Sequence, residues 1–159
     1  VVVGSGHSPE HACLLNERDG VLISGDQVLP RISSNVSVNI TEPDADPLGE
    51  WLDSIDRLLT LPADLTVCPA HGEPFRGLHV RLLALRDEHR MRLYRLAEAI
   101  AEAPMRAVDC FPLLFNRPIG GHNASLATGE ALAHLKRLEI EGRIRREERD
   151  GVWWYHGVA

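Results

Sequence analysis

The sequence lacks any apolar run near the ~20 residues that a membrane-spanning helix needs. Its first residues also lack the basic segment that opens a secretion signal, so a membrane partner is not expected and a cytoplasmic location is the expected default. Cysteine is scarce as well. Cys13, Cys68 and Cys110 form no Cys-x-x-Cys pair and lie in apolar contexts, so we expect no disulfide.

The composition is that of an ordinary globular protein with an uneven charge. The 159 residues are 44% hydrophobic and 25% charged, which is enough for one domain or slightly more. The net charge is −6, and residues 1–75 carry twelve acidic against three basic side chains. Residues 104–159 are close to neutral, which argues against the strongly basic footprint of a nucleic-acid-binding domain.

Three short polar strings each follow an apolar segment that reads as a β-strand. Histidine nitrogen and carboxylate oxygen suit zinc and other divalent metals, and the two oxygens of one aspartate can bridge two ions. A side chain at a strand end is held by a rigid sheet while the following loop stays free to receive a substrate. The strand and candidate ligand pairs are Val1–Val3 with His7, Val21–Ile23 with Asp26, and Leu65–Cys68 with His71.

Each string alone has a simpler explanation, because Gly25-Asp26 is a common turn and Pro69-Ala70-His71-Gly72 a common loop. The order of the three strings along the chain is more specific than any one of them. Gly6-His7-Ser8-Pro9-Glu10-His11, then Ser24-Gly25-Asp26, then Pro69-Ala70-His71-Gly72 resemble the last three metal-binding motifs of the metallo-β-lactamase-fold hydrolases.

The resemblance implies a two-metal hydrolase as the parent protein. In the family's pattern His7 completes one metal site, His71 completes the other, and Asp26 bridges both ions and is the catalytic carboxylate. The implied cofactors are two divalent ions, zinc or alternatively iron or manganese, which share a hydroxide that attacks an electrophilic carbonyl or phosphorus.

The family's first motif, His-x-His-x-Asp-His, does not occur in this sequence. The resemblance therefore implies an α/β chain that forms the C-terminal half of a metallo-β-lactamase-like αββα sandwich. We expect such a chain alone to hold at most one weakly bound ion and to be inactive. An uncovered sheet face would also favour self-association, so a homodimer is one expected state.

The remaining histidines receive weaker interpretations. His11 matches a position that holds glycine or histidine in such motifs, and a structural role is favoured over contact with metal or substrate. His79 and His89 could at most support the ligands or face a substrate. The histidines expected to be structural are His122, His134 and His156.

The spacing of apolar and turn residues predicts the order of the elements. Residues 12–15 and 21–23 form a hairpin around Asp19-Gly20, and residues 27–37 are an irregular pocket wall. Asp46-Pro47 opens one helix, and residues 78–103 form a long helix that ends before Pro104.

The C-terminal third resembles a small winged-helix module. Its expected parts are helices over residues 108–115 and 124–141 and a hairpin of residues 143–148 with 152–156. Its expected apolar face comprises Leu126, Leu132, Leu135, Leu138 and Ile144, against which Trp153 and Tyr155 pack. The predicted domains are residues 1–77, a connecting helix over 78–103, and the winged-helix-like module over 104–159.

Two functions remain open from the sequence. The first is hydrolysis of a thioester, lactone or other small ester, with a small-molecule substrate. The second is a nuclease or nucleic-acid-binding function of the winged-helix-like module. Acidic residues alternate with its candidate cations and weaken the attraction to phosphates, so a cover for the active site or a dimer contact is favoured for this module. The candidate cations are Lys136, Arg137, Arg143, Arg145, Arg146 and Arg149.

Overall fold

The computed structural model describes residues 1–158. Their contacts divide the chain into two compact units, Val1–Val36 with Gly49–Glu88, and Ser37–Leu48 with the residues from His89 onward. The predicted segments 1–77, 78–103 and 104–159 differ from this division, because the long helix belongs to both units and residues 37–48 belong to the second. Among the described residues, no helix is both long and apolar enough to cross a membrane.

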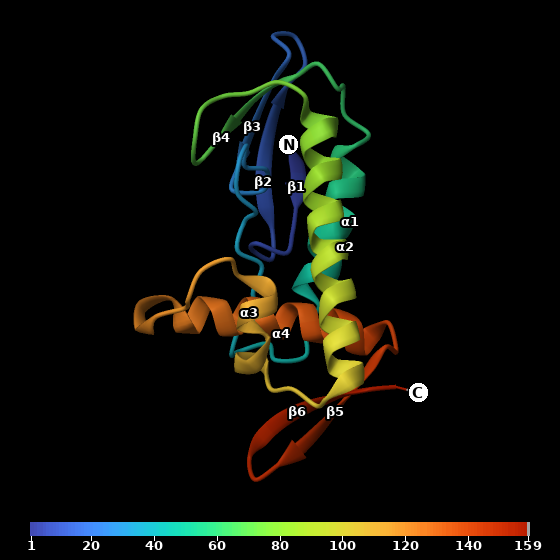
Figure 1. The fold of residues 1–159 in the computed structure, drawn as a ribbon. Coiled ribbons are helices and arrows are strands. Elements are labelled where there is room, and N and C mark those ends of the chain that lie inside the picture. Colours follow the sequence, from blue (N-terminus) through green and yellow to red (C-terminus); the bar gives the residue numbers. More distant parts are fainter. Residues whose placement is uncertain (159) are drawn as a thin grey trace. The chain divides into compact units, whose positions relative to one another are not determined.

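The first unit contains a four-stranded sheet in the order β1-β2-β3-β4 (Figure 1). The pairs β1–β2 and β2–β3 are antiparallel and β3–β4 is parallel. Gly20 has a φ of 63°, which suits the turn of the predicted hairpin between β2 and β3. The strands are β1 (Val2–Gly4), β2 (His11–Asn16), β3 (Val21–Gly25) and β4 (Thr66–Pro69).

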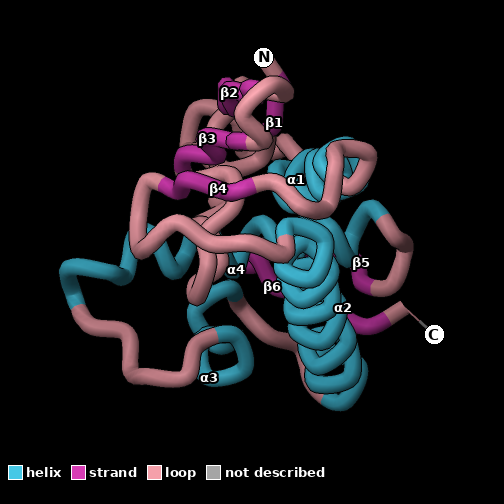
Figure 2. Tube along the Cα trace, turned by 90° about the horizontal axis from the view of Figure 1, so that it is seen from above, coloured by secondary structure: helices cyan, strands magenta, loops and turns pink. Residues whose placement is uncertain are grey.

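One face of this sheet is buried. Cys13, Leu22 and Val67 are fully buried, as expected where alternate side chains point into a core. Helix α1 (Pro47–Leu58) runs alongside the strands, as Figure 2 shows, and buries Trp51 and Ile55. Proline in its first turn fits the helix start that Asp46-Pro47 predicted.

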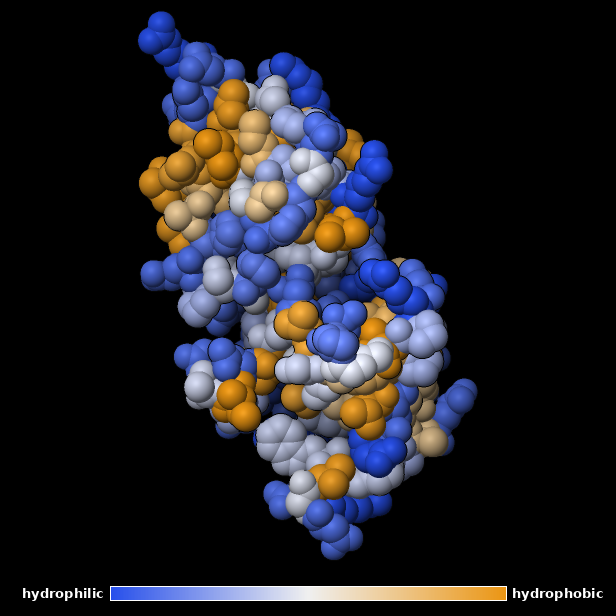
Figure 3. Space-filling model, turned by 90° about the vertical axis from the view of Figure 1, so that its left-hand side faces the viewer, coloured by the Kyte–Doolittle hydropathy of each residue, from blue (hydrophilic) through white to orange (hydrophobic). Residues whose placement is uncertain are grey.

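The opposite face of the sheet is apolar and open. Leu14 pairs with Ile23 across the strands, and both are half exposed, as is Val3 on β1. Figure 3 shows apolar side chains gathered on the surface of the first unit. Contiguous exposed apolar surface of this kind usually marks an interaction site.

Helix α2 (Leu78–Glu102) confirms the long helix predicted for residues 78–103. Its residues 78–88 belong to the first unit, where Leu82 and Leu85 are buried, and its later residues belong to the second, where Leu93 and Leu96 are buried.

The second unit contains short helices, one longer helix and a hairpin. Met105 pairs with Tyr155 in an isolated antiparallel bridge, so the segment after α2 is tied to the hairpin. Asp150 and Gly151 both have positive φ and form the hairpin turn that the sequence predicted. The elements are η1 (Ala107–Cys110), α3 (Phe111–Leu114), η2 (Gly121–Asn123), α4 (Ala124–Ile140), β5 (Ile144–Arg149) and β6 (Val152–Gly157).

The core of the second unit confirms most of the predicted apolar face. Leu135 and Leu138 of α4 are fully buried, and Ile144 and Tyr155 nearly so. The inclusion of Leu126 was wrong. It lies in the first turn of α4 and is 57% exposed, so this turn does not contribute that side chain to the core.

Candidate metal centre

The three candidate ligands meet at the ends of three strands of the first unit. Nε2 of His7 lies 3.7 Å from Oδ2 of Asp26, and Nε2 of His71 lies 3.4 Å from Oδ1 of the same carboxylate. Asp26 therefore presents one oxygen to each histidine. This is the arrangement expected of a carboxylate that bridges two sites.

Glycines with positive φ shape the backbone at these strand ends. Gly6 (φ 97°) precedes His7, Gly25 (φ 54°) precedes Asp26, and Gly72 (φ 85°) follows His71. Only glycine adopts such conformations without steric cost. The chain can thus turn sharply beside each candidate ligand.

His7 is oriented by the main chain. Its Nδ1–H donates a hydrogen bond of 2.8 Å to the carbonyl oxygen of Asn35, which leaves Nε2 with its lone pair on the side of Asp26. A hydrogen bond that fixes the second ring nitrogen is typical of histidines that ligate metals. The side chain of His71 is 70% exposed and has the greater freedom of the two.

The donor set fits divalent metal ions in its chemistry and spacing. A zinc ion bonds a histidine nitrogen at about 2.0–2.1 Å and a carboxylate oxygen at about 2.0–2.2 Å, so it can lie between two such atoms 3.4–3.7 Å apart. Within residues 1–158, no group of three or more His, Cys, Asp or Glu side chains could hold an ion together. Each histidine forms a separate pair with Asp26, and neither pair is a complete zinc shell.

His11 packs against the backbone that leads to Asp26. A Cβ atom built on Gly25 would come within 2.4 Å of the His11 Nε2, so only glycine leaves room for this ring. The ring centroid of His11 is 6.0 Å from that of His7. This placement is compatible with the favoured structural role, in which His11 fills the space beside the Gly25-Asp26 turn.

The structure also gives the burial and contacts of three other histidines. His89, for which a role in supporting the ligands or facing a substrate was the most that we expected, is fully buried. It stacks on His134 in the second unit, with His89 Nδ1 3.1 Å from His134 Nε2. The structural role of His134 is confirmed, since it is also fully buried. His79 Nε2–H donates to the carbonyl of Leu61.

Several residues that shape the site were missed by the sequence reasoning. Asn35 acts through its carbonyl oxygen, which every residue possesses, so no side-chain pattern could have identified it. Gln27 is buried and donates through Nε2 to the carbonyl of Ser5, which joins the loop of Asp26 to the loop of His7. Arg81 binds two carbonyls of the segment after Asp26, but in the sequence it is one of several arginines on a helix.

Comparison with known proteins agrees with this geometry. Residues 1–71 match the family model described as "Metallo-beta-lactamase superfamily", and residues 93–158 match "Metallo-beta-lactamase-like, C-terminal domain". A crystal structure of a Beta-lactamase domain protein from Burkholderia ambifaria matches 99% of this chain with a TM-score of 0.95 and 49% sequence identity. The chain belongs to the metallo-β-lactamase superfamily.

Three other proteins are similar to this chain at lower sequence identity. A metallo-β-lactamase family protein from Thermus thermophilus matches 98% of this chain with a TM-score of 0.83 and 30% identity. "Probable metallo-hydrolase YqjP" of Bacillus subtilis (strain 168) is 28% identical over 146 residues, or 87% of this chain. "Hydroxyacylglutathione hydrolase" of Francisella tularensis subsp. novicida (strain U112) is 28% identical over 104 residues, or 64% of this chain.

This chain spans less than half the length of each of these relatives. It covers 47% and 48% of the two solved chains, and 44% and 39% of the two named hydrolases. The match to the Burkholderia protein includes both units, so the fold of each is found within a longer member of the superfamily.

Proposed function

We propose that His7, Asp26 and His71 are the contribution of this chain to the two-metal centre of a metal-dependent hydrolase. The observation that carries the proposal is the division of the Asp26 carboxylate between the two histidines, at 3.7 Å and 3.4 Å. Asp26 would hold both ions, and each histidine would complete a different site. Membership of the superfamily supports the same assignment.

Residues of this chain would orient the groups that take part in the reaction. Asn35 holds the proton of His7 at Nδ1 and so keeps Nε2 available as a donor atom. Two bound ions supply activation of water and neutralisation of the charge that develops on the scissile group. With three protein ligands for two sites, we propose that this chain alone holds ions weakly and hydrolyses little. Zinc suits the histidine and carboxylate donors, and iron and manganese are the alternatives.

We propose a thioester, lactone or other small ester as the substrate class. The acidic excess of residues 1–75 repels polyanions and does not hinder a small acyl substrate. One relative carries the name hydroxyacylglutathione hydrolase, which describes hydrolysis of an acyl conjugate of glutathione. The superfamily fold by itself does not choose a substrate.

The charges of the second unit argue against the alternative of nucleic-acid binding. Arg137 forms an ion pair of 2.9 Å with Asp46, and Asp44 lies within 3.6 Å of both Lys136 and Arg146. The other three candidate cations also have acidic partners within 4.0 Å. These pairs are Arg143 with Glu141, Arg145 with Glu147, and Arg149 with Glu147. Phosphates would have to displace these carboxylates, which weakens the electrostatic attraction that nucleic-acid binding requires.

The winged-helix-like description of the second unit remains part of our proposal. It is supported by the order of a helix, the bridge at Met105, two further helices and a hairpin. Because the cations on α4 and the hairpin form ion pairs with acidic side chains, we propose that this unit does not bind nucleic acid.

A cobalt titration tests the proposed metal ligands. Cobalt(II) bound by histidine and carboxylate gives visible absorption, which we expect for the unaltered chain and not for Asp26→Asn. The matched control is Asp53→Asn, which removes the same charge from an exposed position on α1. Equal absorption of the Asp26→Asn and unaltered proteins would overturn the proposal.

A further inference from the structure

One irregular segment of the first unit contacts the ring of His7, the carbonyl of Asp26 and the residue after His71. We call residues 29–35 the support loop; they form neither helix nor strand. A Cβ built on Gly72 would lie 2.8 Å from Pro30 Cγ, so the loop packs directly against the residue after His71. The three contacts are Pro30 with Gly72, the Ser34 hydroxyl donating to the Asp26 carbonyl, and the Asn35 carbonyl accepting from His7.

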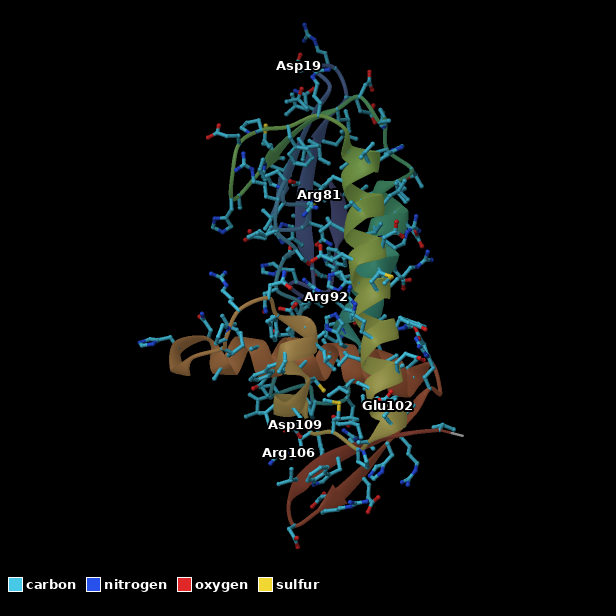
Figure 4. The ribbon with its side chains drawn as sticks, viewed as in Figure 1. Asp19, Arg81, Arg92, Glu102, Arg106 and Asp109 are labelled. Atoms are coloured by element: carbon cyan, nitrogen blue, oxygen red, sulfur yellow. The ribbon has the colours of Figure 1, made fainter. Side chains whose placement is uncertain are left out.

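Arg81 holds the support loop from helix α2. Its Nε donates to the carbonyl of Leu29 at 2.6 Å, and its Nη2 donates to the carbonyl of Ile32 at 2.8 Å. Figure 4 labels Arg81 on α2, beside the strands. The two carbonyls lie three residues apart, so the guanidinium spans the turn that begins the support loop.

The chemistry of arginine suits this task. A guanidinium is planar and rigid, and it presents several N–H donors in a fixed geometry, whereas a lysine ammonium is a single flexible point of charge. Bonds to two carbonyls therefore fix both the position and the direction of the turn. Burial lowers the pKa of Arg81 and nearby Glu88 raises it, but an arginine side chain stays protonated under ordinary conditions.

We infer that Arg81 is a positioning residue for the candidate metal centre, acting through the support loop on His7, Asp26 and His71. The relevance of Arg81 to catalysis rests on the proposed function. Without the guanidinium, the turn at Leu29–Ile32 loses both of these hydrogen bonds, and the Asn35 carbonyl is less firmly held against His7. Fixing a ligand through an outer residue is a common way to tune metal affinity.

The tautomer of His7 reports this effect without metal or substrate. In the unaltered chain the Nδ1–H bond to Asn35 favours one tautomer, which nitrogen NMR of the ring distinguishes at a pH where the ring is neutral. We expect Arg81→Gln to shift His7 towards a mixture of both tautomers. The control Arg86→Gln removes an arginine of the same helix, whose Nη1 bonds Asp56 at 2.6 Å, and should leave the tautomer unchanged.

A conservative variant tests the need for two bonds. Arg81→Lys keeps the charge but cannot form both hydrogen bonds with the fixed geometry of a guanidinium. It should therefore also disturb the tautomer of His7. It serves as the measured variant if Arg81→Gln does not fold. An undisturbed His7 in the folded Arg81 variants, or an equal disturbance in Arg86→Gln, would overturn the inference.

Metal affinity separates this inference from the proposed function. We expect the Arg81 variants to bind cobalt about 10- to 100-fold more weakly than Arg86→Gln, the usual effect of removing an outer partner of a ligand. If the unaltered chain binds no cobalt, the proposed function fails, and the tautomer comparison still decides whether Arg81 positions His7. If cobalt binds equally to the Arg81 and Arg86 variants, the role of Arg81 in the centre is refuted.

Discussion

At the scale of single residues, the candidate centre depends on where one carboxylate points. Asp26 could be selected from the sequence because aspartate after a strand and a glycine is a recognisable pattern, and the structure brings it to both histidines. The orientation of His7 could not be selected in this way. It depends on the backbone carbonyl of Asn35, and a backbone carbonyl is present whatever the residue type.

The buried histidine pair of the second unit makes stability depend on pH. His134 Nδ1–H donates to the Glu130 carbonyl, so its Nε2 accepts from His89 Nδ1–H. Burial lowers the pKa of both histidines, and the positive charge of Arg92 lowers them further. The folded state therefore keeps both rings neutral where the unfolded chain would bind protons.

We predict that unfolding becomes easier as the pH falls below about 6.5, the ordinary histidine pKa. The unfolded state binds more protons there, so the free energy of unfolding falls with pH by up to about 1.4 kcal/mol per pH unit for each histidine. Urea unfolding between pH 7.5 and 5.5 measures the slope. His134→Gln should reduce it, and His122→Gln, at an exposed position, should not. Identical slopes in all three proteins would contradict this explanation.

At the scale of elements, turn residues and apolar spacing were sufficient to predict most of the secondary structure. Asp19-Gly20 and Asp150-Gly151 mark two hairpins, and Pro47 marks the start of α1. The errors concern which helical side chains are buried. The spacing of Leu126 fits the apolar stripe of α4, but the side chain is exposed. The spacing of apolar residues along one helix does not show how far along that helix the neighbouring elements extend.

The packing of α4 predicts a contrast between two leucines. Leu135 is fully buried, so Leu135→Ala should lower the free energy of unfolding by about 2–5 kcal/mol through lost burial and a residual cavity. Leu126→Ala makes the same change at an exposed position and should alter it by less than about 0.5 kcal/mol. Urea unfolding of both variants measures the difference. Similar losses for the two leucines would mean that α4 is packed differently.

At the scale of the whole molecule, the open apolar face of the sheet favours association with another surface. Val3, Leu14 and Ile23 are each half exposed on one face, and water is a poor environment for such a surface. The sequence could predict this face from its resemblance to half of a sandwich. It could not predict which surface covers it, because apolar side chains specify burial but not the identity of a partner.

We predict that the 159-residue chain self-associates through this face. Light scattering over a range of concentrations should detect assemblies larger than the monomer. Leu14→Lys with Ile23→Lys should shift them towards monomer, because two charges would be buried in the contact. Val80→Lys, at a 75% exposed position of α2, is the control and should leave the assemblies intact. A monomer at every concentration would contradict the prediction.

The proposed division of Asp26 between two incomplete sites is tested most directly by counting zinc in the dissolved chain. Elemental analysis after dialysis against metal-free buffer, on protein of confirmed mass, should find less than one zinc ion per chain. A following zinc titration should show weak binding that Asp26→Asn abolishes and Asp53→Asn preserves. Close to two tightly held ions per chain, or unchanged binding by Asp26→Asn, would contradict the account.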